Sequence, residues 1–155
     1  MSPYYVGIDS GTQSTKVLVV DEGGRVVGRG QAAHEMIQGL FPHEKEQHPD
    51  TWRGALIAAF CEAISAGGID AKQIRGVGVS GQQHGFVPLD EKGNVIRAAK
   101  LWCDTSTAAE CEHITHAVGG PHKYRALIGN DLPPGFTASK ILWLKNHEPE
   151  NFARL

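Results

Sequence analysis

Three apolar runs in the first third of the chain predict three consecutive β-strands. The runs are Tyr4–Ile8, Ser14–Val20 and the more loosely alternating Arg25–Gln31, and their β-branched residues are typical of strands. Residues 9–13 connect the first two runs, and Gly23-Gly24 between the last two fits a tight hairpin turn because glycine tolerates positive φ. Such short connections predict an antiparallel meander.

The pattern then changes to a helical period. Residues 34–50 show no steady period and predict a surface loop. Apolar side chains next recur at helical spacing, so we expect a helix that begins at an Asp50 cap, continues to about Ser65 and stops at Gly67-Gly68. Ile74–Gln82 follows as a strand of small residues. This order of elements predicts a mixed α/β fold.

The remaining residues predict a hairpin followed by helices. Phe86–Leu89 and Val95–Ala98 flank the turn-forming residues 90–94. Thr107 and Glu110 have the spacing of a capping box. The expected helices run from Thr107 to about Val118, from His122 to Leu127, from Ala138 to Asn146 with Thr137 as the cap, and onward from Pro149.

The composition excludes several classes of protein. The chain has 155 residues, 41% of them hydrophobic, and a net charge of −2, which fits neither a disordered tail nor the basic footprint of a nucleic-acid binder. It contains no apolar run long enough for a membrane helix and no secretory signal at its start. Its three cysteines form no Cys-x-x-Cys pair, so we expect a reduced, cytoplasmic protein. The length alone predicts one compact domain.

The end of the first predicted strand carries the first candidate site. Asp9 places a carboxylate at the end of a buried strand, which is costly unless the charge is paired or bound to a cation. The following turn contains Gly11, which lets backbone N–H groups approach an anion, and Thr12 offers a hydroxyl. A carboxylate beside a phosphate cradle suits Mg²⁺, which prefers oxygen ligands. An ordinary hairpin turn, in which Asp9 and Ser10 satisfy the backbone, explains these residues equally well.

The end of the fourth predicted strand carries the second candidate site. Gln82, Gln83 and His84 lie between two glycines and offer many hydrogen-bond donors and acceptors. Such side chains suit a polyhydroxylated ligand, and ligands of open α/β sheets tend to lie beyond the carboxyl ends of strands. The alternative is that His84 only satisfies a backbone group at a turn.

A third candidate site follows the predicted hairpin. Trp102 offers a flat apolar face for the C–H side of a sugar, and Asp104 could accept hydrogen bonds from hydroxyl groups. A core tryptophan, with Asp104 helping to cap the next helix, is the alternative interpretation.

Together these segments resemble the N-terminal part of the FGGY family of carbohydrate kinases. Residues 7–12 look like the family's first phosphate loop, which the wider actin-like ATPase group shares. Residues 80–85 are similar to the segment that the xylulokinase branch uses on its sugar. Residues 101–104 and 130–140 also match in order and spacing, and the resemblance covers essentially the whole chain.

The resemblance implies a ribonuclease-H-like, actin-like ATPase fold with a mixed sheet. It also implies that ATP, with Mg²⁺, phosphorylates a ketopentose, D-xylulose, at its 5-hydroxyl. Residues 1–155 would then be part of an N-terminal sugar-binding domain, with the nucleotide-binding domain outside this chain. A cytoplasmic homodimer without nucleic-acid or membrane partners is the expected setting.

The resemblance also implies roles for individual residues. Asp9 would be catalytic and would hold Mg²⁺, with Gly11, Thr12 and Gln13 near the phosphates. The residues expected to contact the sugar are Gln83, His84, Trp102 and Asp104.

Some positions depart from the family pattern. Cys103 and Ser106 stand where many members carry Asn and Arg, and Ser139 replaces a common proline. Nothing in the chain matches the family's general-base aspartate or its adenosine site, so the isolated chain is expected to be inactive. The Gln83-His84 pair argues against glycerol, for which the family typically places Arg and Glu here. Ribulose and gluconate kinases, a non-catalytic sugar-binding module, and an actin-like phosphatase or ATPase remain alternatives.

Overall fold

The computed structural model describes residues 3–155, which divide into two compact units. The first unit comprises the chain up to Met36 together with Pro49–Gln82, and the second comprises Ile37–His48 and Gln83–Leu155. No helix in residues 3–155 is long and apolar enough to cross a membrane.

The first unit is built on a four-stranded mixed sheet with the order β3-β2-β1-β5. β1 and β2 pair antiparallel, as do β2 and β3, whereas β1 and β5 pair parallel. The predicted meander and the fourth strand are confirmed. The strands are β1 (Tyr4–Ser10), β2 (Ser14–Asp21), β3 (Val26–Ala33) and β5 (Ile74–Gly81).

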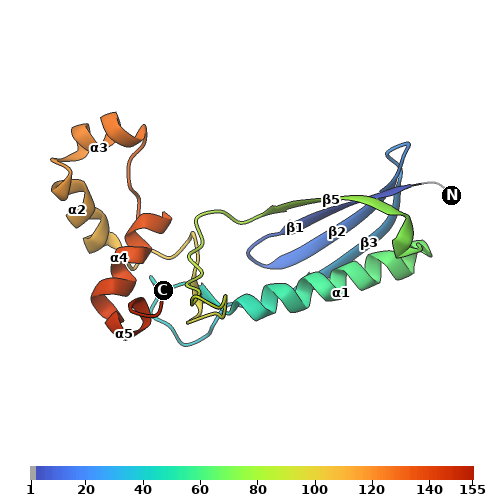
Figure 1. Cartoon of the computed structure of the whole chain (residues 1–155), viewed down its shortest axis with the longest axis horizontal. Helices are drawn as coiled ribbons and strands as arrows, with labels where there is room; N and C mark the ends of the chain where they lie inside the picture. Colours follow the sequence, from blue (N-terminus) through green and yellow to red (C-terminus); the bar gives the residue numbers. More distant parts are fainter. Residues whose placement is uncertain (1–2) are drawn as a thin grey trace. The chain divides into compact units, whose positions relative to one another are not determined.

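One long helix, α1 (Pro49–Gly67), packs on one face of this sheet (Figure 1). A short 3-10 helix, Ala71–Gln73, connects it to β5. The core contains alternate residues of the strands, which point to one face because the side-chain period of a strand is two. Its buried members are Val6, Val17, Val19, Ala59, Ala63 and Ile69.

Two glycines of β3 allow α1 to approach the sheet closely. A Cβ atom on Gly30 would overlap the carbonyl oxygen of Ala59, and one on Gly28 would overlap that of Ala63. Both glycines are buried, and Arg29 between them points to the opposite face, which is exposed. The spacing of helix and sheet therefore depends on the absence of side chains at these two positions.

Gly30→Ala is expected to lower the free energy of unfolding by about 1–3 kcal/mol, because the new methyl group has no space beneath α1. Gly54→Ala is the matched control, since Gly54 is an exposed residue of α1 with open space around its Cβ position. This control should stabilise the helix by up to about 1 kcal/mol. Denaturant unfolding measures both changes, and equal stability of the two variants would contradict the packing described.

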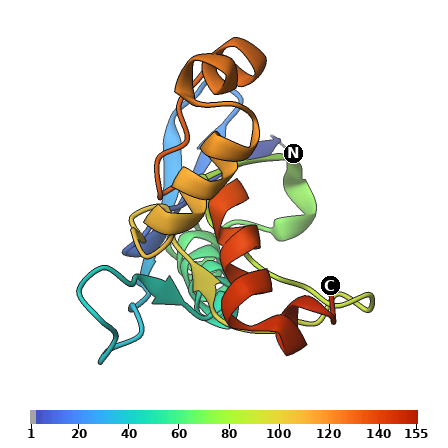
Figure 2. The same cartoon turned by 90° about the vertical axis from the view of Figure 1, so that its left-hand side faces the viewer.

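The second unit contains four helices and a two-stranded sheet (Figure 2). α2 packs against both α3 and α4, and α4 contacts α5. The strands β4 and β6 pair antiparallel. The elements are β4 (Glu46–Gln47), β6 (Ala99–Lys100), α2 (Ala108–Ala117), α3 (Pro121–Ile128), α4 (Thr137–His147) and α5 (Pro149–Phe152).

Local details of the second unit differ from the sequence predictions. Thr107 precedes α2 but makes no side-chain cap, because its hydroxyl donates instead to the carbonyl of Pro134 at 2.9 Å. α4 begins at Thr137 itself, with Phe136 in the cap position. The hairpin around residues 90–94 has its turn, yet it carries only isolated bridges rather than a continuous ladder.

The interpretation of residues 34–50 as a surface loop is wrong at one point. Glu46 and Gln47 form β4 and are buried, because β4 pairs with β6. A strand of two residues is too short to produce a period in the sequence.

Candidate functional site

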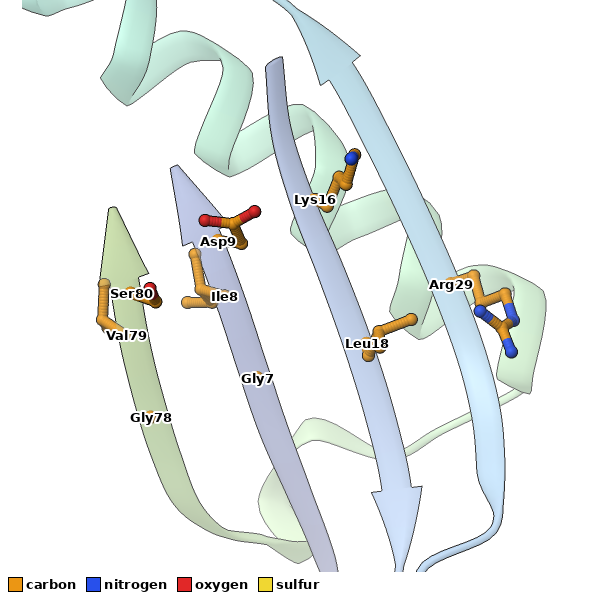
Figure 3. Close-up of a pocket in the computed structure, with 9 residues that line it drawn as sticks. All are labelled: Gly7, Ile8, Asp9, Lys16, Leu18, Arg29, Gly78, Val79 and Ser80. Carbon is orange, nitrogen blue, oxygen red and sulfur yellow. The ribbon is translucent and has the colours of Figure 1, made fainter. Parts of the chain in front are cut away.

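Asp9 lies in a hollow on the face of the sheet that points away from the core of the first unit. The hollow has a volume of about 660 Å³ and is lined by residues of all four strands. Figure 3 shows the side chains of Asp9, Lys16 and Arg29 on the neighbouring strands β1, β2 and β3. The Asp9 side chain is exposed and makes no hydrogen bond or ion pair within residues 3–155. Its carboxylate oxygens are therefore available to a ligand.

The loop after β1 is held in a tight turn. The backbone N–H of Gly11 donates to the carbonyl of Ser14 at 3.0 Å, and the hydroxyl of Thr12 donates to the side-chain oxygen of Gln82 at 3.2 Å. Gln13 at the tip is exposed. In this turn the Gly11 N–H and the Thr12 hydroxyl are bonded within the protein, whereas the exposed Gln13 amide beside the end of β1 can donate to an anion.

A buried histidine lies beside this loop. The His34 backbone N–H donates to the carbonyl of Gln13, and its ring Nε2 lies 3.3 Å from the hydroxyl of Thr15. Burial lowers the pKa of His34 more than the carbonyls of Thr12 and Ser14 raise it. A neutral imidazole therefore fits this position, and stability should decline as the pH falls below 6.5 toward the lowered pKa, because the unfolded chain then binds the proton more readily. Sequence analysis assigned no role to His34.

In the second unit, Gln83 and His84 are both exposed. His84 has a φ of 58°, and it is the single non-glycine residue with positive φ within residues 3–155. Its ring stacks on that of Phe136, with centroids 4.2 Å apart and planes inclined by 13°. The imidazole is therefore presented to solvent from a fixed backbone and against a fixed aromatic face.

Trp102 also exposes a large apolar surface. Its side chain is 50% accessible, which excludes the interpretation as a core tryptophan within this unit. An exposed indole face is the surface on which a sugar ring or chain can rest its C–H groups.

Asp104 lies in a different environment from the one its expected role requires. It is fully buried, and its carboxylate accepts hydrogen bonds from the Lys45 backbone at 2.9 Å, from Ser106 and from Lys100. Burial raises the pKa of Asp104, but the hydrogen bonds and the Lys100 charge together lower it by more than burial raises it. The pKa of Asp104 therefore lies below its ordinary value. The burial favours a role in fixing the loop around Trp102 over direct contact with a sugar.

A buried charge cluster surrounds this carboxylate, and sequence reasoning missed it. The Lys100 ammonium is fully buried, lies 3.0 Å from Glu46 and 3.3 Å from Asp104, and sits 4.0 Å from the ring centroid of Trp143. Arg97 donates to both carboxylate oxygens of Glu46 at 2.8 Å. In the sequence these charges resemble surface residues, because Glu46 meets Arg97 and Lys100 only across more than fifty residues, although Asp104 lies four residues from Lys100.

Lys100→Met should destabilise the protein by about 3–5 kcal/mol, because it leaves two carboxylates buried without their shared cation. Lys92→Met, at an exposed position of the turn before β6, is the control and should change stability little. Thermal and denaturant unfolding report the difference. A Lys100→Met protein as stable as the control would show that the cluster does not hold this unit together.

The predicted site residues thus fall into one group in each unit. The group of the first unit comprises Asp9, Gly11, Thr12 and Gln13, and that of the second comprises Gln83, His84, Trp102 and Asp104. Sequence analysis left open whether Lys16 faces a ligand or solvent, placed Ser80 at the start of the sugar segment and did not single out Arg29, although all three line the same hollow as Asp9. Alternation along the strands could have placed Arg29 there.

Comparisons with known proteins identify relatives for nearly the whole chain. The model of the FGGY family of carbohydrate kinases, N-terminal domain, matches residues 4–155. The xylulose kinase of Haemophilus influenzae is 38% identical over 97% of this chain, and that of Streptomyces coelicolor is 41% identical over 96%. The chain spans 31% and 30% of the lengths of these two relatives.

Solved structures agree with the family model. The crystal structure of a xyloylose kinase from Brucella ovis matches with a TM-score of 0.90 and 34% identity, covering 98% of this chain and 31% of that protein. The expected actin-like ATPase fold with a mixed sheet is confirmed by this likeness.

Proposed function

Because this chain belongs to the FGGY family of carbohydrate kinases, we propose that it forms the sugar-side part of an enzyme that transfers the γ-phosphate of ATP to D-xylulose. The observation that carries the proposal is the exposed pair Gln83-His84, presented beside Phe136 in a chain 38% and 41% identical to two xylulose kinases. Relatives are about three times as long, so the activity is assigned to the intact protein that carries this chain.

The first phosphate loop suits a magnesium–nucleotide ligand. Asp9 offers two free carboxylate oxygens, the kind of ligand that Mg²⁺ prefers, and the exposed side-chain amide of Gln13 in the neighbouring turn can donate to a phosphate oxygen. Gln13 would lie near the transferring group. When bound, Mg²⁺ would neutralise part of the phosphate charge. Asp9 would hold the metal, and the loop would orient the phosphates.

The reaction requires mainly positioning and charge neutralisation. The sugar 5-hydroxyl oxygen forms a bond to the γ-phosphorus as the bond from that phosphorus to the ADP oxygen breaks. The hydroxyl proton passes to a base that none of the assigned residues of this chain supplies. Gln83, His84 and Trp102 would hold the sugar, and Asp104 would fix the loop that carries Trp102.

The same residues are compatible with other functions. A ribulose or gluconate kinase would use the same loop with a different acceptor, and a non-catalytic module would bind the sugar alone. An actin-like ATPase or phosphatase would need no sugar at all. We also propose a cytoplasmic location and a homodimer, as the family resemblance implies.

The experiment uses the intact protein with ATP, Mg²⁺ and D-xylulose, and it identifies the product by ³¹P NMR. D-xylulose 5-phosphate is expected, whereas the isolated 155-residue chain should form none because it lacks the base and the adenosine site. Parallel reactions with D-ribulose, gluconate and glycerol test the alternatives. If one of these compounds gives a higher kcat/KM than D-xylulose, that compound is the substrate. Product formed by the isolated chain would contradict the proposal that the base and the adenosine site lie outside it.

A further inference from the structure

Lys140 is a fully buried cation of α4 that the proposed reaction does not use. Its ammonium donates to two backbone carbonyls, those of His84 at 2.7 Å and Gly135 at 2.6 Å. Removing an ammonium from water costs several kcal/mol unless good partners replace the water. Because the buried Lys140 ammonium donates to these two carbonyls, it holds the backbone at His84 and the backbone at Gly135 together.

The first of these points is the backbone of His84. This residue adopts the left-handed conformation with a φ of 58°, which is unfavourable for a residue that carries a Cβ atom. The conformation persists only where neighbours fix it. Two contacts do so: the bond from Lys140 to the His84 carbonyl, and the stacking of the imidazole on Phe136.

The second point is Gly135, which lies against the other exposed candidate sugar contact. A Cβ atom on Gly135 would overlap the carbonyl oxygen of Trp102, so the two backbones are in direct contact. The same ammonium that binds the His84 carbonyl thus binds the residue that supports Trp102. Gly135, Phe136 and Lys140 form a short scaffold, the α4 entry segment, beneath both side chains.

We propose that Lys140 is a positioning residue of the sugar site, and that its ammonium fixes the left-handed backbone of His84 and the Gly135 support of Trp102. The inference rests on the proposed function, in which His84 and Trp102 hold the sugar. Lys140 touches neither sugar nor phosphate, so its loss acts on sugar binding and leaves the nucleotide side unchanged.

The test is Lys140→Met in the intact protein, which keeps the length of the side chain and removes its donors. The KM for D-xylulose is expected to rise at least about tenfold, the effect of losing roughly 1.4 kcal/mol of binding free energy, while the KM for ATP stays within about twofold. Lys145→Met is the matched control, because Lys145 is exposed on the same helix. It should leave both constants unchanged.

Phe136 provides a second pair of variants with milder effects on folding. Phe136→Leu removes the aromatic face and should raise the sugar KM as Lys140→Met does. Phe136→Tyr keeps the ring and should have the wild-type sugar KM. A merely structural role would lower the melting temperature of Phe136→Leu and Lys140→Met without this selective rise in the sugar KM.

The wild-type protein gives an independent measurement. Burial lowers the pKa of Lys140 to about 8, so raising the pH through 8 removes the charge that strengthens both hydrogen bonds, and the sugar KM should rise. The charged and titratable groups that act on this ammonium are Asp104, Lys100, Cys103 and Cys111. The same measurement in a background with both cysteines replaced by serine serves as the control for their contribution.

The outcomes separate the two proposals. A wild-type protein that does not phosphorylate D-xylulose overturns the proposed function, and with it the sugar role of Lys140. An active wild type overturns only the positioning role if the sugar KM of Lys140→Met is unchanged. Should that variant fail to fold, an unchanged sugar KM in Phe136→Leu together with a flat wild-type pH profile overturns it equally.

Discussion

Replacing Asp9 by asparagine is expected to lower kcat of the intact protein by at least about 100-fold, the effect typical of removing one group that stabilises transition-state charge. The substitution keeps the shape of the side chain and removes its negative charge. Asp9 is proposed to hold Mg²⁺ and the phosphates, whereas Gln83, His84 and Trp102 are proposed to hold the sugar. The affinity for D-xylulose should therefore stay within about twofold of the wild-type value.

Steady-state kinetics and sugar binding by calorimetry measure these two effects separately. Glu22→Gln is the matched control, because Glu22 is an exposed carboxylate in the turn between β2 and β3 of the same sheet. It should leave turnover unchanged. A loss of sugar affinity as large as the loss of turnover in Asp9→Asn would instead assign Asp9 to the sugar.

His84→Ala is expected to weaken sugar binding, whereas Asp9→Asn is expected to lower turnover. It removes the imidazole proposed to hydrogen-bond the sugar, so the KM for D-xylulose should rise by about tenfold or more, as expected for losing 1.5 kcal/mol or more of hydrogen bonding. The KM for ATP should change little. His113→Ala, at an exposed position of α2, serves as the control and should change neither constant.

The backbone at position 84 makes a further distinction accessible. His84→Gly removes the imidazole and also relieves the strain of a φ of 58°. It should be at least as stable as His84→Ala and equally poor in sugar affinity. If both variants keep the wild-type sugar KM, His84 is not part of the sugar site.

The sheet of the first unit could be predicted from the sequence because local signals determine it. Alternating apolar residues identify β1 and β2, and Gly23-Gly24 marks the turn before β3. The helical period of α1 is equally local. Family resemblance was needed only to relate these elements to a known fold.

The second unit was predicted less well because its structure depends on distant partners. Glu46 is buried by Arg97, which lies 51 residues away, and the Thr107 hydroxyl is drawn to a carbonyl 27 residues away instead of capping its helix. Lys140 likewise meets His84 across 56 residues. A single sequence contains no local signal for such pairs, so their charges resemble those of an ordinary exposed surface.

The expected site was similarly predicted in part. The exposure of Gln83, His84 and Trp102 fits side chains that meet a ligand, whereas the burial of Asp104 does not. The exposed residues and the buried Asp104 all follow a strand or a turn, and the sequence around them is similar, so the sequence alone does not distinguish them. The difference arises from Lys100 and the Lys45 backbone, which together occupy the Asp104 carboxylate.

Sugar-dependent release of ADP by the intact protein tests the central claim most directly. We predict that adding D-xylulose to protein, ATP and Mg²⁺ raises the rate of ADP release by at least about 100-fold and yields one sugar phosphate per ADP. ADP release at the same rate without sugar would contradict the proposed kinase and support an ATPase.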